Sequence, residues 1–156
     1  MTTNHILIGL GGTGAKVLAA FRRSIFELEG RKDPEGENVE YLYVDSSPEY
    51  MKREHDLWRI PGGDIYPGES SQLNIQGQSL GRILEDISRY PNIKPWIGEV
   101  ERWSHIQAAI SEGIGGQKRR LGRFLFACQA SAFVRKLQAQ YNACKERTKA
   151  VNVVFH

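Results

Sequence analysis

Apolar residues near the start of the chain switch between strand-like runs and helix-like spacing. A short buried strand is predicted over residues 5–8, and a second over residues 39–44. Between them, apolar residues recur at i, i+3 and i+4, which predicts a helix beginning at about Gly14 and ending near Gly30. The apolar face of that helix is expected to contain Val17, Leu18, Phe21, Ile25 and Leu28. This strand–helix–strand order favours a βαβ unit with parallel strands.

The rest of the chain continues the alternation less regularly. Residues 48–77 are rich in proline and glycine, which predicts a loop with a short helix near 48–53. A closing strand is predicted over 150–155. Further helices are predicted over 79–90 with Ser79 as N-cap, over 100–111, and over 117–145 as one long run. Strands alternating with helices indicate an α/β fold, a Rossmann-like parallel sheet flanked by helices.

Composition and charge narrow the classes of function. The 156 residues carry a net charge of +3 and fit one ordinary soluble domain. The basic run Lys118–Arg120 has no aromatic-and-basic module beside it, so nucleic acid is not an expected partner. No signal peptide or run of about 20 apolar residues is visible, so we expect a cytoplasmic protein with no membrane span. Cys128 and Cys144 fall too far apart in one predicted helix to form a disulfide.

A glycine-rich turn stands between the first strand and the first helix. Its sequence, Gly-Leu-Gly-Gly-Thr-Gly, matches the G-x-G-x-x-G pattern in the required context. Glycines let the backbone approach a phosphate, and a helix N-terminus favours an anion. The residues expected to bind phosphate are Gly9, Gly11, Gly12, Thr13 and Gly14. The alternative is a tight strand–helix turn without a ligand.

Polar residues follow the second strand. Asp45 and Ser46 are candidates for a contact with ribose or for part of a second nucleotide loop. Asp45 lies 31 residues after Gly14, whereas about 20 is typical of the dinucleotide fingerprint. The alternative is that the residues from Asp45 to Pro48 form a turn or a helix cap. Both roles are compatible with each other.

A second glycine cluster precedes the long predicted helix. Gly115, Gly116 and Gln117 are expected to form a second phosphate cradle, with charge from one residue of the basic run at 118–120. The alternative is a simple separator between two helices. The sequence does not tell which of the three cations would face the site.

In order and content, these segments resemble the tubulin/FtsZ superfamily, and bacterial tubulin-like proteins in particular. The segments that resemble the family's first, second and third loops and the strand feeding its fourth are Ile8–Gly14, Tyr41–Ser47, Gly113–Gly116 with Gly122 and Arg123, and Val151–Phe155. The resemblance implies GTP or GDP as ligand, accompanied by Mg²⁺, and self-association into filaments. It also implies a polymerising cytoskeletal GTPase.

The resemblance also sets expectations about domain organisation. Residues 1–156 are expected to form one nucleotide-binding domain, the N-terminal portion of a tubulin-like GTPase domain, in which 54–112 is an irregular, insertion-like segment. The family's Gly-Gly-Gly-Thr-Gly-Ser/Thr-Gly loop would follow His156, so this portion alone is expected to hydrolyse GTP negligibly. No catalytic residue and no metal-ligand set is assigned in the chain itself.

Two other functions compete with this one. The glycine pattern also fits a Rossmann domain that binds NAD(P) or ATP, from an oxidoreductase or an adenylating enzyme, in which the 113–123 turn has no role. The third reading is a non-catalytic interaction module that keeps the fold without a ligand.

Overall fold

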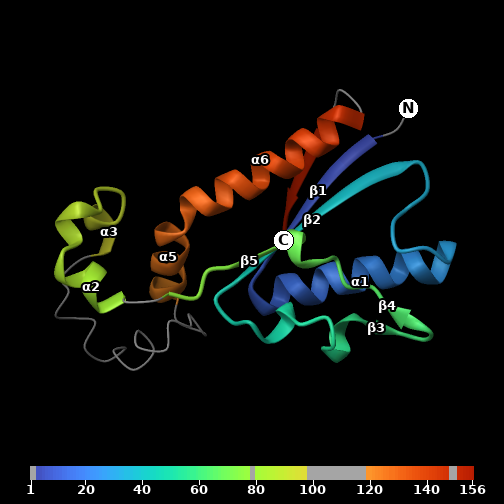
Figure 1. The fold of residues 1–156 in the computed structure, drawn as a ribbon, viewed down its shortest axis with the longest axis horizontal. Helices are drawn as coiled ribbons and strands as arrows, with labels where there is room; N and C mark the ends of the chain where they lie inside the picture. The colour runs from blue at the N-terminus through green and yellow to red at the C-terminus, as the bar shows by residue number, and fades with distance from the viewer. Residues whose placement is uncertain (1–2, 78–79, 98–118, 148–150) are drawn as a thin grey trace.

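A parallel sheet forms the centre of the molecule. The computed structural model describes residues 3–77, 80–97, 119–147 and 151–156. Within them, the main sheet has four parallel strands in the order β5-β2-β1-β6 (Figure 1). These strands are β1 (Thr3–Leu10), β2 (Glu37–Asp45), β5 (Gln72–Asn74) and β6 (Val151–Phe155). The predicted α/β architecture is confirmed.

Helices cover both faces of this sheet. Helix α1 (Gly11–Glu29) packs on β1 and β2, and α6 (Ala130–Arg147) packs on all four strands. Figure 1 shows α6 above the strands and α1 below them. Each face has its own apolar cluster, because successive residues of a strand point to opposite sides. The sheet is therefore the middle layer of a three-layer α/β arrangement.

The buried face of α1 differs from the predicted one. Val17 and Leu28 are 38% and 82% exposed, so their assignment to the core face is wrong. The residues of α1 that are buried are Gly14, Ala15, Leu18, Ala19 and Arg22. The helix ends where predicted, since Gly30 is left-handed with φ 68° and its amide bonds to the carbonyl of Phe26.

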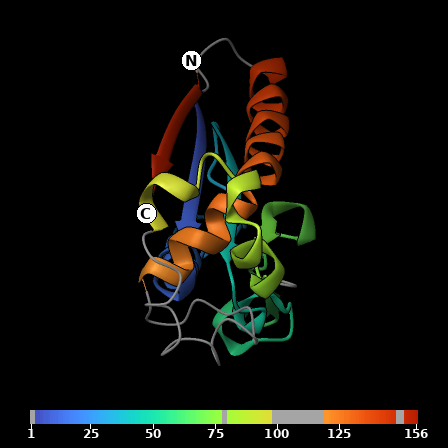
Figure 2. The same ribbon diagram turned by 90° about the vertical axis from the view of Figure 1, so that its left-hand side faces the viewer.

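The long helix predicted over 117–145 is wrong as a single element. It is two helices, α5 (Arg119–Cys128) and α6, which Figure 2 shows running in different directions. At the break the amide of Gln129 bonds back to the carbonyl of Phe126, a tight three-residue turn. The ring centroids of Phe126 and Phe133 lie 5.1 Å apart across the bend, so packing between the two helices stabilises it. The two cysteines, on separate helices, are free thiols.

The segment after β2 is more ordered than predicted. The expected short helix near 48–53 is present as the 3₁₀ turn η1 (Glu49–Met51). The remaining elements up to the main sheet are η2 (Asp56–Trp58), β3 (Arg59–Ile60), β4 (Gly63–Asp64) and η3 (Glu69–Ser71). Strand β5, which joins the main sheet beside β2, was not predicted from the sequence.

The helix predicted over 79–90 is shorter than expected. It consists of α2 (Leu80–Glu85) followed by the 3₁₀ turn η4 (Ile87–Arg89), and α3 (Lys94–Ile97) comes next. The proposed cap Ser79 and the predicted helix 100–111 lie outside the described residues.

A side chain of α6 completes the short pairing between β2 and β5. Strand β5 pairs with β2 only at residues 43–45. Beyond that stretch the carbonyl of Tyr41 accepts a hydrogen bond from the buried side chain of Gln140. A buried carbonyl without a partner would be costly, so this bond fixes α6 against the sheet.

Gly122 offers a direct test of the assignment of α5. It lies inside the helix, its φ is not positive, and no described residue is within 4 Å of an added Cβ. A Gly122→Ala variant is therefore expected to raise the free energy of unfolding by about 0.5–1 kcal/mol, the difference in helix propensity. Chemical denaturation measures this free energy. A decrease of about 0.5–1 kcal/mol instead of an increase would contradict a helix with open space at Gly122.

Candidate functional site

The carboxyl ends of three strands meet at the start of α1. Strand β1 lies between β2 and β6, and its last residue, Leu10, is in register with Val44. The amide of Leu10 donates to the carbonyl of His156 at 2.9 Å, and the His156 amide donates to Ile8 at 2.8 Å. This edge of an open parallel sheet is where ligands of α/β proteins bind.

The glycine turn is tighter than the sequence indicated. Gly9 and Leu10 still belong to β1, and the helix begins at Gly11 without an intervening loop. Gly11 has φ +67°, a backbone conformation that residues other than glycine rarely adopt. No described residue lies within 4 Å of a Cβ added at this position. No part of the chain that the structure describes therefore blocks the Gly11 backbone on this side.

Gly9 and Gly14 pack against each other. A Cβ on Gly14 would lie 2.4 Å from the carbonyl carbon of Gly9, and a Cβ on Gly9 would lie 2.8 Å from the Gly14 oxygen. Both residues are buried. Their role in the turn is thus the close approach of helix to strand, which the third glycine of such patterns provides.

The first turn of α1 has neither an acidic residue nor a side-chain cap from its N-cap residue. The N-cap residue Leu10 makes no side-chain hydrogen bond to the helix, and the first turn contains no acidic residue. The first amides of a helix have no carbonyl of their own helix to bond. Gly11 and Gly12 are half-buried, and Thr13 and Lys16 are exposed. The arrangement suits a phosphate, since free amides and the positive end of the helix dipole point the same way.

Asp45 shapes the turn after β2. Its Oδ1 accepts from the amide of Ser47 at 3.0 Å, and its Oδ2 accepts from the Tyr43 hydroxyl at 2.6 Å. Burial, together with the hydrogen bond to Asp45, raises the pKa of Tyr43, so that hydroxyl remains a donor. The turn predicted from Asp45–Pro48 is confirmed in this hydrogen bond to Ser47. Ser46 is buried, and a ribose contact by either residue stays a prediction.

The comparison with family models matches the tubulin-like family over residues 6–154. The match covers nearly the whole sequence. The chain belongs to the tubulin-like family. No curated protein and no solved structure matched it.

Part of the site expected for a tubulin-like protein lies outside the residues that the structure describes. Gly115, Gly116 and Gln117, the predicted second phosphate cradle, are outside the described residues, as is Lys118. Helix α5 is described from Arg119 onward. Whether this loop meets the first glycine turn therefore stays a prediction.

Sequence reasoning missed Tyr50 in this tubulin-like chain. A Cβ on Gly12 would lie 3.0 Å from Cε2 of the Tyr50 ring. No motif marks Tyr50, because its position depends on how the segment after β2 folds back over α1. The ring makes Tyr50 a neighbour of the expected phosphate-binding turn.

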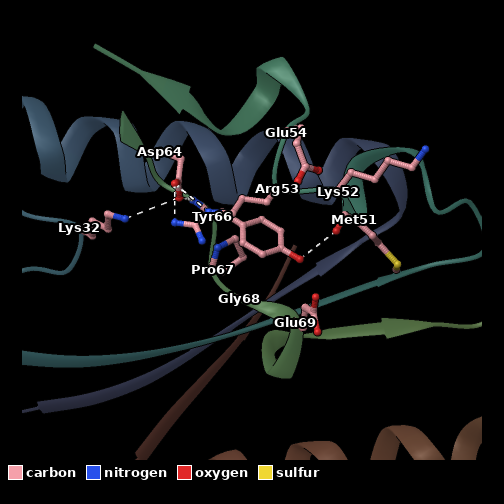
Figure 3. Close-up of a pocket in the computed structure, with 10 residues that line it drawn as sticks. All are labelled: Lys32, Met51, Lys52, Arg53, Glu54, Asp64, Tyr66, Pro67, Gly68 and Glu69. Atoms are coloured by element: carbon pink, nitrogen blue, oxygen red, sulfur yellow. Dashed lines mark hydrogen bonds and ion pairs between the residues drawn. The ribbon is translucent and has the colours of Figure 1, made fainter. Parts of the chain in front are cut away.

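A separate groove lies along the segment that follows β2, and no residue of the glycine turn lines it. Its volume is about 710 Å³ (Figure 3). Its charged lining residues are three cations and three acids: Lys32, Lys52, Arg53, Glu54, Asp64 and Glu69. With this balance of charge, the groove is a poorer match for a polyphosphate than the α1 N-terminus.

Asp64 is a carboxylate of that groove that forms ion pairs with two cations. Arg53 contacts it at 2.9 Å and Lys32 at 3.6 Å. Burial would raise the pKa of Asp64, but hydrogen bonds from Arg53 and the Tyr66 amide, with the charge of Lys32, hold it below its usual value. These contacts tie the loop after α1 to the β3–β4 hairpin.

The described part of the chain contains neither a cluster of metal ligands nor a helix that could span a membrane. No group of three or more His, Cys, Asp or Glu side chains there is placed to hold a metal ion. None of the helices described is both long enough and apolar enough to cross a membrane.

Proposed function

We propose that the chain binds guanine nucleotide, GTP or GDP, with phosphates on the backbone amides of Gly11, Gly12 and Thr13. The observation that carries this proposal is the uncapped N-terminus of α1, which follows directly from a central parallel strand and has no acidic residue in its first turn. Gly9 and Gly14 contribute by letting the helix approach the strand closely. Membership of the tubulin-like family supports guanine as the base.

The other residues of the proposed site surround that turn. The Thr13 hydroxyl is available as an additional donor, because the side chain is exposed. Asp45 and Ser46 are proposed to contact the ribose or to form part of a second nucleotide loop. A Mg²⁺ ion would arrive with the phosphates and be held mainly by them and by water. Gly115, Gly116 and Gln117 are proposed as the second cradle, for the terminal phosphate.

The biological role proposed is that of a polymerising, cytoskeletal GTPase of the cytoplasm, or part of one. Family membership supports self-association into filaments as the mode of action. Catalysis in such nucleotide-dependent systems depends mainly on positioning and electrostatics, so it requires the full set of loops.

A Rossmann domain binding NAD(P) or ATP is the second candidate. The strand order β5-β2-β1-β6 corresponds to the central part of the dinucleotide fold, and the glycine pattern is shared with it. A non-catalytic module without a ligand is the third.

A panel of nucleotides tests these proposals. GTP or GDP with Mg²⁺, at about 100 times Kd, is expected to stabilise the protein by roughly 2.7 kcal/mol. In a protein of this size that raises Tm by roughly 5–11 °C. ATP and NAD serve as the matched comparisons. A larger shift with NAD or ATP would favour the Rossmann enzyme, and no shift with any nucleotide would favour the interaction module.

A further inference from the structure

Tyr50 lies against the backbone that is proposed to bind phosphate. The ideal Cβ position of Gly12 is 3.0 Å from Cε2 and 3.7 Å from Cδ2 of the Tyr50 ring. Real Cβ contacts are rarely this short, so the ring occupies the space beside Gly12 that a side chain would need. The first turn of α1 therefore has an aromatic support on one side.

Neighbouring residues contact both the backbone and the ring of Tyr50. The buried indole of Trp58 donates its N–H to the Tyr50 carbonyl at 2.8 Å. The ring of His55 packs edge-on against the Tyr50 ring, with centroids 4.8 Å apart. The His55 ring is itself fixed, because its Nδ1 accepts a hydrogen bond from the Leu57 amide at 3.0 Å.

The same segment is fastened along α1. Trp58 packs into the cluster formed by the inner face of that helix. Arg23 donates to the carbonyl of Leu57 at 3.1 Å, and Arg22 donates to the carbonyl of Ile65 at 2.7 Å. These contacts hold the backbone of the segment 50–65 against α1, and the His55 ring packs on the Tyr50 ring that faces Gly12.

We propose that Tyr50 is a positioning residue of the nucleotide site, whose ring holds the Gly12 backbone so that the first-turn amides keep their orientation toward phosphate. This inference rests on the proposed function. The ring edge, rather than the hydroxyl, makes the contact with Gly12. Phenylalanine should therefore replace tyrosine, whereas alanine should not.

Binding of GTP with Mg²⁺ by calorimetry is the first test. Tyr50→Ala is expected to weaken the affinity about tenfold, the effect of weakening one hydrogen bond to a charged group. Tyr50→Phe is expected to stay within about twofold of the original chain, because the ring edge is kept. Val39→Ala is the matched control, since Val39 packs on the same apolar cluster from β2 and lies outside the segment 50–65, and it should lower Tm but leave affinity within about twofold.

A cycle of melting temperatures tests the contact without any nucleotide. Gly12→Ala should fail to raise Tm when Tyr50 is present, because the new methyl group meets the ring. In the Tyr50→Ala background the same substitution should raise Tm, since alanine is the better helix former. The two substitutions are thus expected to be non-additive.

The outcomes separate this inference from the proposed function. Failure of the original chain to bind GTP overturns the proposed function and the positioning role together. Tight GTP binding that Tyr50→Ala leaves unchanged overturns only the positioning role, as does a fully additive cycle. If Tyr50→Ala does not fold, Tyr50→Leu takes its place, because leucine keeps apolar bulk and removes the ring edge.

Discussion

A Gly14→Ala variant is expected to lose roughly 3 kcal/mol of its free energy of unfolding, at the upper end of the usual cost of overpacking. The added methyl group would lie 2.4 Å from the carbonyl carbon and 2.7 Å from the Cα of Gly9. Both obstacles are backbone atoms of the central strand, so no side-chain rotation relieves them. The helix must instead shift away from β1, and the packing of Ala15 and Leu18 is lost with it.

Thermal and chemical denaturation check this expectation. In a domain of this size the loss corresponds to a fall in Tm of roughly 6–12 °C. Gly63→Ala is the matched control, because Gly63 has no positive φ and no described residue within 4 Å of an added Cβ. Equal melting temperatures for the two variants would show that Gly9 and Gly14 are not in contact.

The sequence was most informative where local chemistry determines structure. The apolar patterns on either side of Gly9–Gly14 predicted the strand and the helix, the glycines predicted the turn between them, and Gly30 predicted the helix end. It did not tell which glycines pack and which stay open. That division depends on the contact between Gly14 and Gly9, which also brings Leu18 inward, four residues after Gly14, and leaves Val17 partly exposed.

Long-range pairing explains the elements that were missed. Strand β5 has three residues, of which only Leu73 is buried, and it exists through its pairing with β2. The bend at Gln129 has no glycine or proline beside it, and contacts such as that between Phe126 and Phe133 accompany it. Tyr50 likewise enters the site through the fold of its segment. Periodicity reports burial along one element and carries little information about such partners.

Replacing Thr13 by glutamate is expected to separate nucleotide binding from stability. Thr13 is exposed in the first turn of α1, where no acidic residue is present. A carboxylate near a helix N-terminus stabilises the helix by about 0.3–1 kcal/mol, so Tm should be unchanged or slightly higher. A bound polyphosphate would meet that charge at close range, and repulsion of about 1–4 kcal/mol follows for charges roughly 4 Å apart.

The affinity for GTP in Thr13→Glu is therefore expected to fall on the order of tenfold or more. Thr13→Gln is the control, because it has nearly the shape of glutamate without its charge. A loss confined to Thr13→Glu, and reduced at high salt, assigns the effect to repulsion between charges. Equal losses in both variants would indicate steric exclusion instead. Unchanged GTP affinity in Thr13→Glu would place the phosphates elsewhere, because no anion could share that helix N-terminus with a carboxylate at no cost.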